Sequence, residues 1–209
     1  MSGHHHHHHH RAGRHLAFGL AITFGFGLVE AVAGWWSGSL ALISDAGHML
    51  SDSFSLGLAA AAERISHRQG TGQGELHRAE LWAALINTLL MAAIVLWIVY
   101  EAIDRLQSPQ PVMGEVVIGI AFIGIAVNVA VAYIISHGEQ TLNTRAAMLH
   151  VMGDLAGSVV ALISGITIYF GGWLAVDPIL SLVVALLIGF ATLNLLREAL
   201  SAARGRRGA

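Results

Sequence analysis

Cysteine and lysine are both absent from this 209-residue sequence, and charged residues make up only 11% of it. Without cysteine, disulfide bonds and thiolate metal ligands are excluded, and the sequence gives no information on the redox compartment. A soluble domain usually carries about 25% charged residues. Here 55% of the residues are hydrophobic and the mean hydropathy is +0.65. The composition therefore predicts an integral membrane protein.

Six apolar stretches are each close to the roughly 20 residues that a helix needs to cross a bilayer. They cover about residues 15–36, 39–62, 79–103, 113–135, 145–170 and 177–199. The polar stretches 63–78 and 136–144 are expected to be loops, and the prolines within 107–111 end the third helix. The sequence thus predicts an all-α fold of six transmembrane helices with both termini on the same side.

Arginines are distributed unevenly over the two predicted sides of the membrane. All eleven basic residues are arginines, and only Arg105 falls on the side opposite the termini. Cytoplasmic connections of membrane proteins carry an excess of positive charge. We therefore expect cytoplasmic N- and C-termini.

The two ends of the chain are expected to lie outside the transmembrane domain of residues 15–200. Residues 1–14 contain seven consecutive histidines, which indicate either a purification tag or a native metal-collecting tail. Residues 201–209 form a short basic cytoplasmic tail in this interpretation. Its arginines reflect topology, and no nucleic-acid partner is expected.

A polar motif from Ser44 to Asp52 interrupts the second apolar stretch. His48 and Asp52 are four residues apart, so they share one face of a helix, and His150 and Asp154 repeat this spacing in the fifth stretch. Two imidazoles and two carboxylates form a tetrahedral nitrogen and oxygen set that zinc accepts. A purely structural hydrogen-bond network is the alternative. Because an acid at membrane depth costs roughly 2.5–3.5 kcal/mol, two matched pairs favour a metal site.

Other polar residues inside the predicted helices need roles as well. Asp45 lies three residues before His48, so it is expected to orient that histidine or to line the access path. Glu30, Asn87 and Asn128 are expected to be interhelical hydrogen-bond partners or vestibule groups rather than ligands.

Three further residues lie near predicted helix ends. Asp177 is expected to cap the sixth helix. His67 and His77 could form a weak metal site in the predicted loop, although ordinary loop histidines are the simpler interpretation.

The polar motifs resemble those of the cation diffusion facilitator family, a family of zinc-exporting secondary transporters. The resemblance covers roughly residues 15–200 and is carried by positions 37–42, 45–52, 83–87, 143–147 and 150–154. It implies that the second and fifth helices supply the transport site, with the two His-Asp pairs as ligands. This ligand set implies zinc as the transported substrate rather than a cofactor, with cadmium or cobalt as further candidates.

The same resemblance implies a multi-pass homodimer in the lipid bilayer of a bacterial inner membrane, exchanging zinc for protons. Most members carry a cytoplasmic metal-binding domain of ferredoxin-like fold after the sixth helix, and this chain is expected to lack it. We expect a transporter and not an enzyme. The competing hypotheses are a membrane-embedded zinc metalloenzyme and a passive divalent cation channel.

Overall fold

The computed structural model describes residues 9–69, 73–137 and 142–205, which form six helices and no strand. The all-α prediction is thus confirmed. The helices are α1 (His9–Ser37), α2 (Leu40–Gln69), α3 (Gln73–Gln107), α4 (Gly114–Ser136), α5 (Leu142–Gly171) and α6 (Val176–Gly205).

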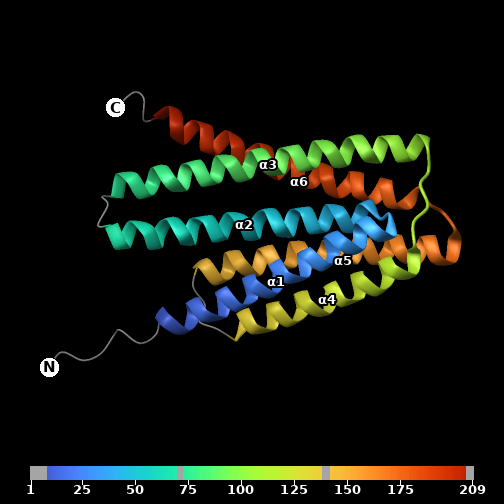
Figure 1. Cartoon of the computed structure of the whole chain (residues 1–209), viewed down its shortest axis with the longest axis horizontal. Coiled ribbons are helices and arrows are strands. Elements are labelled where there is room, and N and C mark those ends of the chain that lie inside the picture. Colours follow the sequence, from blue (N-terminus) through green and yellow to red (C-terminus); the bar gives the residue numbers. More distant parts are fainter. Residues whose placement is uncertain (1–8, 70–72, 138–141, 206–209) are drawn as a thin grey trace.

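Five stretches of the described residues are long and apolar enough to cross a membrane. They are Phe18–Ser37, Leu85–Gln107, Gly114–Ser136, Ala147–Gly171 and Val176–Asn194. α2 contributes none of the five, and its N-terminal half carries the polar motif. It nevertheless runs the length of the bundle in contact with α1, α3, α5 and α6 (Figure 1). The chain is therefore a multi-pass membrane protein.

The six helices form one bundle in which consecutive helices run in opposite directions (Figure 1). α3 packs on α6, and α4 packs on α5 and α1. The α1–α2, α3–α4 and α5–α6 connections share one end of the bundle, which we call the turn end (Figure 1). α1 begins and α6 ends at the opposite end, which we call the terminal end.

The connection predicted at residues 63–78 is shorter than expected. α2 continues to Gln69 and α3 begins at Gln73, so the prediction of a long loop is wrong. A helix can continue beyond the bilayer through a polar stretch that contains good helix formers, here glutamate, arginine and glutamine. Thirty residues of α2 span about 45 Å, which exceeds the roughly 30 Å hydrocarbon core.

Three other predicted boundaries also shift outward. α5 begins at Leu142, inside the stretch 136–144 that was predicted to be a loop, and residues 138–141 lie outside the described part. α6 extends to Gly205 rather than to residue 199. α1 begins at His9, while residues 1–8 are not described.

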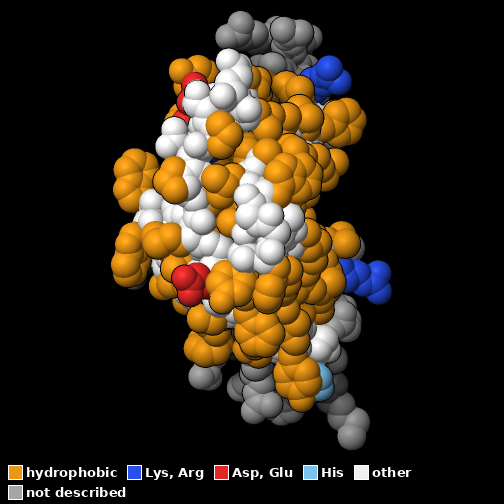
Figure 2. All heavy atoms as spheres, turned by 90° about the vertical axis from the view of Figure 1, so that its right-hand side faces the viewer, with side chains coloured by type: hydrophobic (Ala, Val, Ile, Leu, Met, Phe, Trp, Pro, Cys, Tyr) orange, Lys and Arg blue, Asp and Glu red, His pale blue; other side chains and the backbone are white. Residues whose placement is uncertain are grey.

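The turn end exposes many hydrophobic side chains. In Figure 2, which faces this end, hydrophobic side chains predominate and few charged ones interrupt them. Trp35 and Trp36 in the last turn of α1 and Trp173 in the α5–α6 connection are all largely exposed. Tryptophan is enriched at the boundary between hydrocarbon and headgroups, so these side chains mark where the bundle meets one membrane interface.

The α1–α2 turn is held against the α3–α4 connection by backbone contacts. Gly38 has φ +73°, and a Cβ at that position would lie 2.6 Å from the carbonyl oxygen of Pro111, so only glycine fits. Arg105 Nη1 donates a hydrogen bond to the Gly38 carbonyl. The backbone N–H of Met113 donates to the carbonyl of Ser37 at 2.9 Å. Arg105 thus neutralises the carbonyl end of α1.

Candidate metal centre

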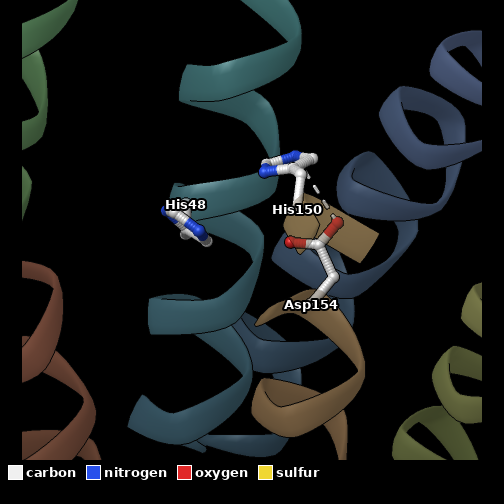
Figure 3. Close-up of side chains that lie close together, drawn as sticks. All are labelled: His48, His150 and Asp154. Atoms are coloured by element: carbon white, nitrogen blue, oxygen red, sulfur yellow. Dashed lines mark ion pairs between the residues drawn. The ribbon is translucent and has the colours of Figure 1, made fainter. Parts of the chain in front are cut away.

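α2 and α5 bring the two predicted His-Asp pairs together in the interior of the bundle (Figure 3). Asp52 Oδ2 lies 3.6 Å from His48 Nε2 on its own helix and 3.2 Å from His150 Nδ1 on α5. Asp154 Oδ2 lies 3.6 Å from His150 Nε2. The two imidazole rings are 5.7 Å apart. All four residues singled out from the sequence therefore belong to one cluster.

The cluster is electrostatically incomplete without a cation. Asp154 is 0% exposed, and neither of its carboxylate oxygens has a hydrogen-bond partner within the described residues. The side chains of His48, Asp52 and His150 are each 25% exposed. A buried charge without a partner is strongly unfavourable, so the site favours a bound cation.

The donor atoms of the cluster suit zinc. One ligand atom from each of His48, His150 and Asp154 lies within 4.8 Å of those of the other two. Two imidazole nitrogens and two carboxylates match the four-coordinate preference of zinc, whereas calcium and magnesium take six or more oxygens. His48 Nδ1 is buried and has no hydrogen-bond partner in the described part of the chain, so no hydrogen bond competes with an ion for this nitrogen.

Asp45 is joined to α4 and α5 rather than to His48. Its Oδ2 accepts a 3.3 Å hydrogen bond from Ser158 Oγ, which in turn accepts one from Asn128 Nδ2 at 3.3 Å. A Cβ on Gly157 would lie 2.1 Å from Asp45 Oδ1, so a larger residue here would displace the Asp45 carboxylate. Asp45 and Asn128 thus form a buried polar connection across three helices beside the cluster.

The remaining predicted polar residues take different positions. Asn87 Oδ1 accepts a 2.9 Å hydrogen bond from Ser51 Oγ and so links α3 to α2, as expected for an interhelical partner. Glu30 is fully buried, and neither of its carboxylate oxygens has a partner among the described residues. His67 and His77 lie on the helical backbones of α2 and α3, and their side chains fall outside the described residues.

Asp177 caps α2 rather than α6, so the prediction for this residue is wrong. Its carboxylate accepts hydrogen bonds from the backbone N–H groups of Leu40 at 2.6 Å and Ala41 at 3.4 Å. It also accepts from Ser39 Oγ at 2.7 Å and from Ser164 Oγ at 3.1 Å. Sequence reasoning missed this contact because capping patterns are local, whereas Asp177 and Leu40 are 137 residues apart.

Comparison with known proteins gives a consistent set of relatives. Residues 16–202 match the family model of the cation efflux transmembrane domain. The chain is 42% identical over 193 residues to the zinc transporter ZitB of Escherichia coli (strain K12). The aligned region covers 90% of this chain and 61% of that protein.

The names of two other relatives refer to several metals or to metal cations in general. The cadmium, cobalt and zinc/H(+)-K(+) antiporter of Bacillus subtilis (strain 168) is 42% identical over 169 residues, covering 78% of this chain and 54% of that protein. The metal cation efflux system protein CzcD of Cupriavidus metallidurans is 36% identical over 203 residues, covering 96% of this chain and 64% of that protein. The chain therefore spans between 54% and 64% of the length of these three relatives.

Proposed function

This chain belongs to the cation efflux family, and from that premise we propose that it exports zinc from the cytoplasm in exchange for protons. The proposed zinc ligands are the cluster residues His48, Asp52, His150 and Asp154. The observation that carries the proposal is the convergence of two His-Asp pairs from helices far apart in sequence. They meet around the buried Asp154 carboxylate, which has no hydrogen-bond partner among the described residues. In this proposal zinc is the transported substrate, and no resident cofactor is needed.

Energetics favour an exchanger over a passive pore. Moving one charge against 100 mV costs about 2.3 kcal/mol, so exporting Zn²⁺ from a negative-inside cell costs about 4.6 kcal/mol per 100 mV. A passive channel would therefore let zinc leak inward. Importing one proton offsets about half of this electrical cost, and each pH unit across the membrane adds about 1.4 kcal/mol.

The proposed ligands supply a direct way to couple zinc to protons. Imidazole binds a metal only in its neutral form, so a proton and zinc compete for the same ring nitrogen. Zinc affinity at this site therefore falls as the pH falls. Protons that enter from the outer side displace zinc there, and their release to the cytoplasm restores the site.

The side of the site that faces the turn end is closed in this structure. Leu40, Ala41, Leu42, Ser44 and Asp45 all have exposed fractions of 5% or less. Zinc could leave toward that end only if the N-terminal turns of α2 separated from their neighbours. Transport by alternating access around the cluster is the mechanism that this packing supports.

The relatives and the ligand set also suggest the wider properties of the transporter. Cadmium and cobalt are further candidate substrates, because they appear in the name of the Bacillus subtilis relative and accept nitrogen and oxygen ligands. We place the protein in a bacterial inner membrane with cytoplasmic termini, and we expect it to function as a homodimer. The possible weak site of His67 and His77 stays a prediction.

Two other functions are less well supported. A zinc hydrolase usually keeps three protein ligands and an open coordination position, whereas four matched ligands meet here. A passive channel would not use a proton gradient. We therefore propose that the chain is a transporter and not an enzyme.

The test is zinc uptake into proteoliposomes under an imposed pH gradient. We expect wild-type protein to accumulate zinc above its equilibrium concentration in vesicles that are acidic inside, and to lose this accumulation when a protonophore collapses the gradient. Asp154→Ala should abolish accumulation while the protein stays folded. If zinc entered only until its concentration was equal inside and outside the vesicles, the result would support a channel. Full activity in Asp154→Ala would mean that the ligands are misassigned.

A further inference from the structure

Polar contacts join α2 and α5 at three levels, and the metal cluster lies at one end of this series. At the first level Ser39 and Ser164 both donate to Asp177 Oδ1. At the second level Ser158 donates to Asp45. The third level is the contact between Asp52 and His150. From the first level to the third, the residue numbers rise along α2 and fall by nearly equal amounts along α5. This is expected for antiparallel helices in one fixed register.

Small residues allow a close contact between α2 and α5 near the turn end. Ala41 and Leu42 of α2 and Ala161 of α5 belong to the same core cluster, Leu162 packs against it, and Gly157 lies against Asp45. Small residues let helices approach closely, but they provide few side-chain knobs that would resist sliding of one helix along the other. The polar contacts therefore add to what the two leucines contribute to the register.

Asp177 is the contact that holds the level nearest the turn end. Its carboxylate is fully buried and its two oxygens accept from the first turn of α2 and from α5, although the residue itself belongs to α6. A negative charge at a helix N-terminus interacts favourably with the unpaired N–H groups there. Hydrogen bonds to a charged group are also stronger than neutral ones. One side chain thus ties the start of α2 to both α5 and α6.

We propose that Asp177 is a positioning residue for the metal centre, which fixes the register of α2 against α5 and so brings the two His-Asp pairs together. The proposal rests on the ligand role proposed above. It assigns Asp177 no contact with the metal. A shift of α2 by a fraction of a turn would separate Asp52 from His150 while leaving each His-Asp pair intact on its own helix. Removing Asp177 should therefore weaken metal binding from a distance.

The experiment measures zinc affinity of the purified full-length chain by titration calorimetry, with zinc salt as the only ligand. In every variant serine replaces the seven histidines at positions 4–10, so that the histidine run does not bind the added zinc. Asp177→Asn keeps the size of the side chain but removes its charge and turns an NH₂ group toward N–H donors. We expect its Kd for zinc to rise about tenfold, as for other residues that orient metal ligands, with one bound ion per chain as in wild type.

Two matched controls separate positioning from a general loss of stability. Ser181→Ala removes the 2.7 Å hydrogen bond from Ser181 Oγ to the Asp177 carbonyl and so perturbs the same buried turn of α6 without touching α2. Glu115→Gln removes an exposed carboxylate from the first turn of α4, at the same end of the bundle. Both should keep the wild-type Kd. The visible absorption of bound Co²⁺, which reports tetrahedral geometry, should change in Asp177→Asn alone.

The outcomes distinguish this proposal from the proposed function. If His48→Ala binds zinc as tightly as wild type, the ligand assignment fails. If His48→Ala loses zinc but Asp177→Asn keeps the wild-type Kd and Co²⁺ spectrum, only the positioning role is overturned. Should Asp177→Asn not be recovered folded, the double variant Ser39→Ala with Ser164→Ala decides, because it removes one donor immediately before α2 and one on α5. Positioning requires this double variant to bind zinc more weakly than Ser181→Ala does.

Discussion

Asp154 shows why the four cluster residues are not equivalent. It is fully buried and has no hydrogen-bond partner in the described residues, whereas His48, Asp52 and His150 are partly exposed. The buried carboxylate therefore depends most on a bound cation, while the two histidines remain partly accessible from outside the cluster. In the transport proposal Asp154 contributes mainly to affinity, and the choice among metals depends on the nitrogen ligands.

Replacing one nitrogen ligand should change both metal choice and pH dependence. His48→Asp leaves three carboxylates with one imidazole, which hardens the site and should admit harder ions such as manganese. With only one imidazole left to compete for protons, zinc transport should fall less steeply as the pH is lowered from 8 to 6. The measurement is transport of zinc, cadmium and manganese by both proteins across this range. An unchanged metal ranking and pH profile would mean that His48 is not a ligand.

Individual residues differ in how far the sequence alone could place them. Both His-Asp pairs are visible because the i, i+4 spacing is a property of a single helix, and finding it twice in apolar surroundings predicts the partnership. Asp177 is not visible in this way, because its partners lie on α2 and α5. Asp45 was expected to orient His48 or to line the access path, and the structure shows that it accepts a hydrogen bond from Ser158. These contacts depend on the register between helices, and no local pattern encodes that register.

At the scale of elements, two glycines of α5 show that the same sequence pattern can occur with and without a role in helix packing. Gly153 and Gly157 form a Gly-x-x-x-Gly pair, but only Gly157 lies against another helix. A Cβ at Gly157 would clash with Asp45, whereas nothing lies within 4 Å of a Cβ at Gly153. The pattern in the sequence is the same at both positions, and the arrangement of helices decides which one matters.

Alanine at the two positions should therefore have opposite effects. Gly157→Ala would displace the buried Asp45 carboxylate that Ser158 holds, and should lower the free energy of unfolding by about 1–3 kcal/mol, as overpacking does. It should also weaken zinc transport, since the cluster spans the same two helices. Gly153→Ala should be neutral or stabilising, because alanine suits an open helix position better than glycine. Thermal unfolding in detergent measures both changes, and equal shifts would contradict the close contact at Gly157.

The number of helices was predictable and their lengths were not. Hydrophobic stretches predict where the chain lies in the bilayer, and this gave six helices in the right order. They do not say where a helix ends outside the bilayer, because backbone hydrogen bonds within a helix are satisfied equally well in water. α2 and α3 therefore continue through the polar residues that were predicted to form a loop.

For the whole molecule, the charge distribution agrees with the arrangement of the helices. The start of α1 and the end of α6 lie at one end of the bundle (Figure 1). Among the described residues Arg105, in the last turn of α3, is the single arginine at the other end. That arginine has a structural role, because it binds Glu101 at 2.9 Å and the Gly38 carbonyl. Its presence at the turn end therefore does not weaken the prediction of cytoplasmic termini.

Cysteine labelling in intact cells tests this orientation, and the native chain is a clean background because it contains no cysteine. Ser108→Cys places an exposed thiol in the α3–α4 connection at the turn end, and Gly205→Cys places one at the last residue of α6. A membrane-impermeant maleimide added outside should label position 108 and should reach position 205 only after the membrane is permeabilised. The opposite pattern would put the termini outside. Zinc leaving toward the turn end would then move into the cell, so the direction of transport proposed here would have to be reversed.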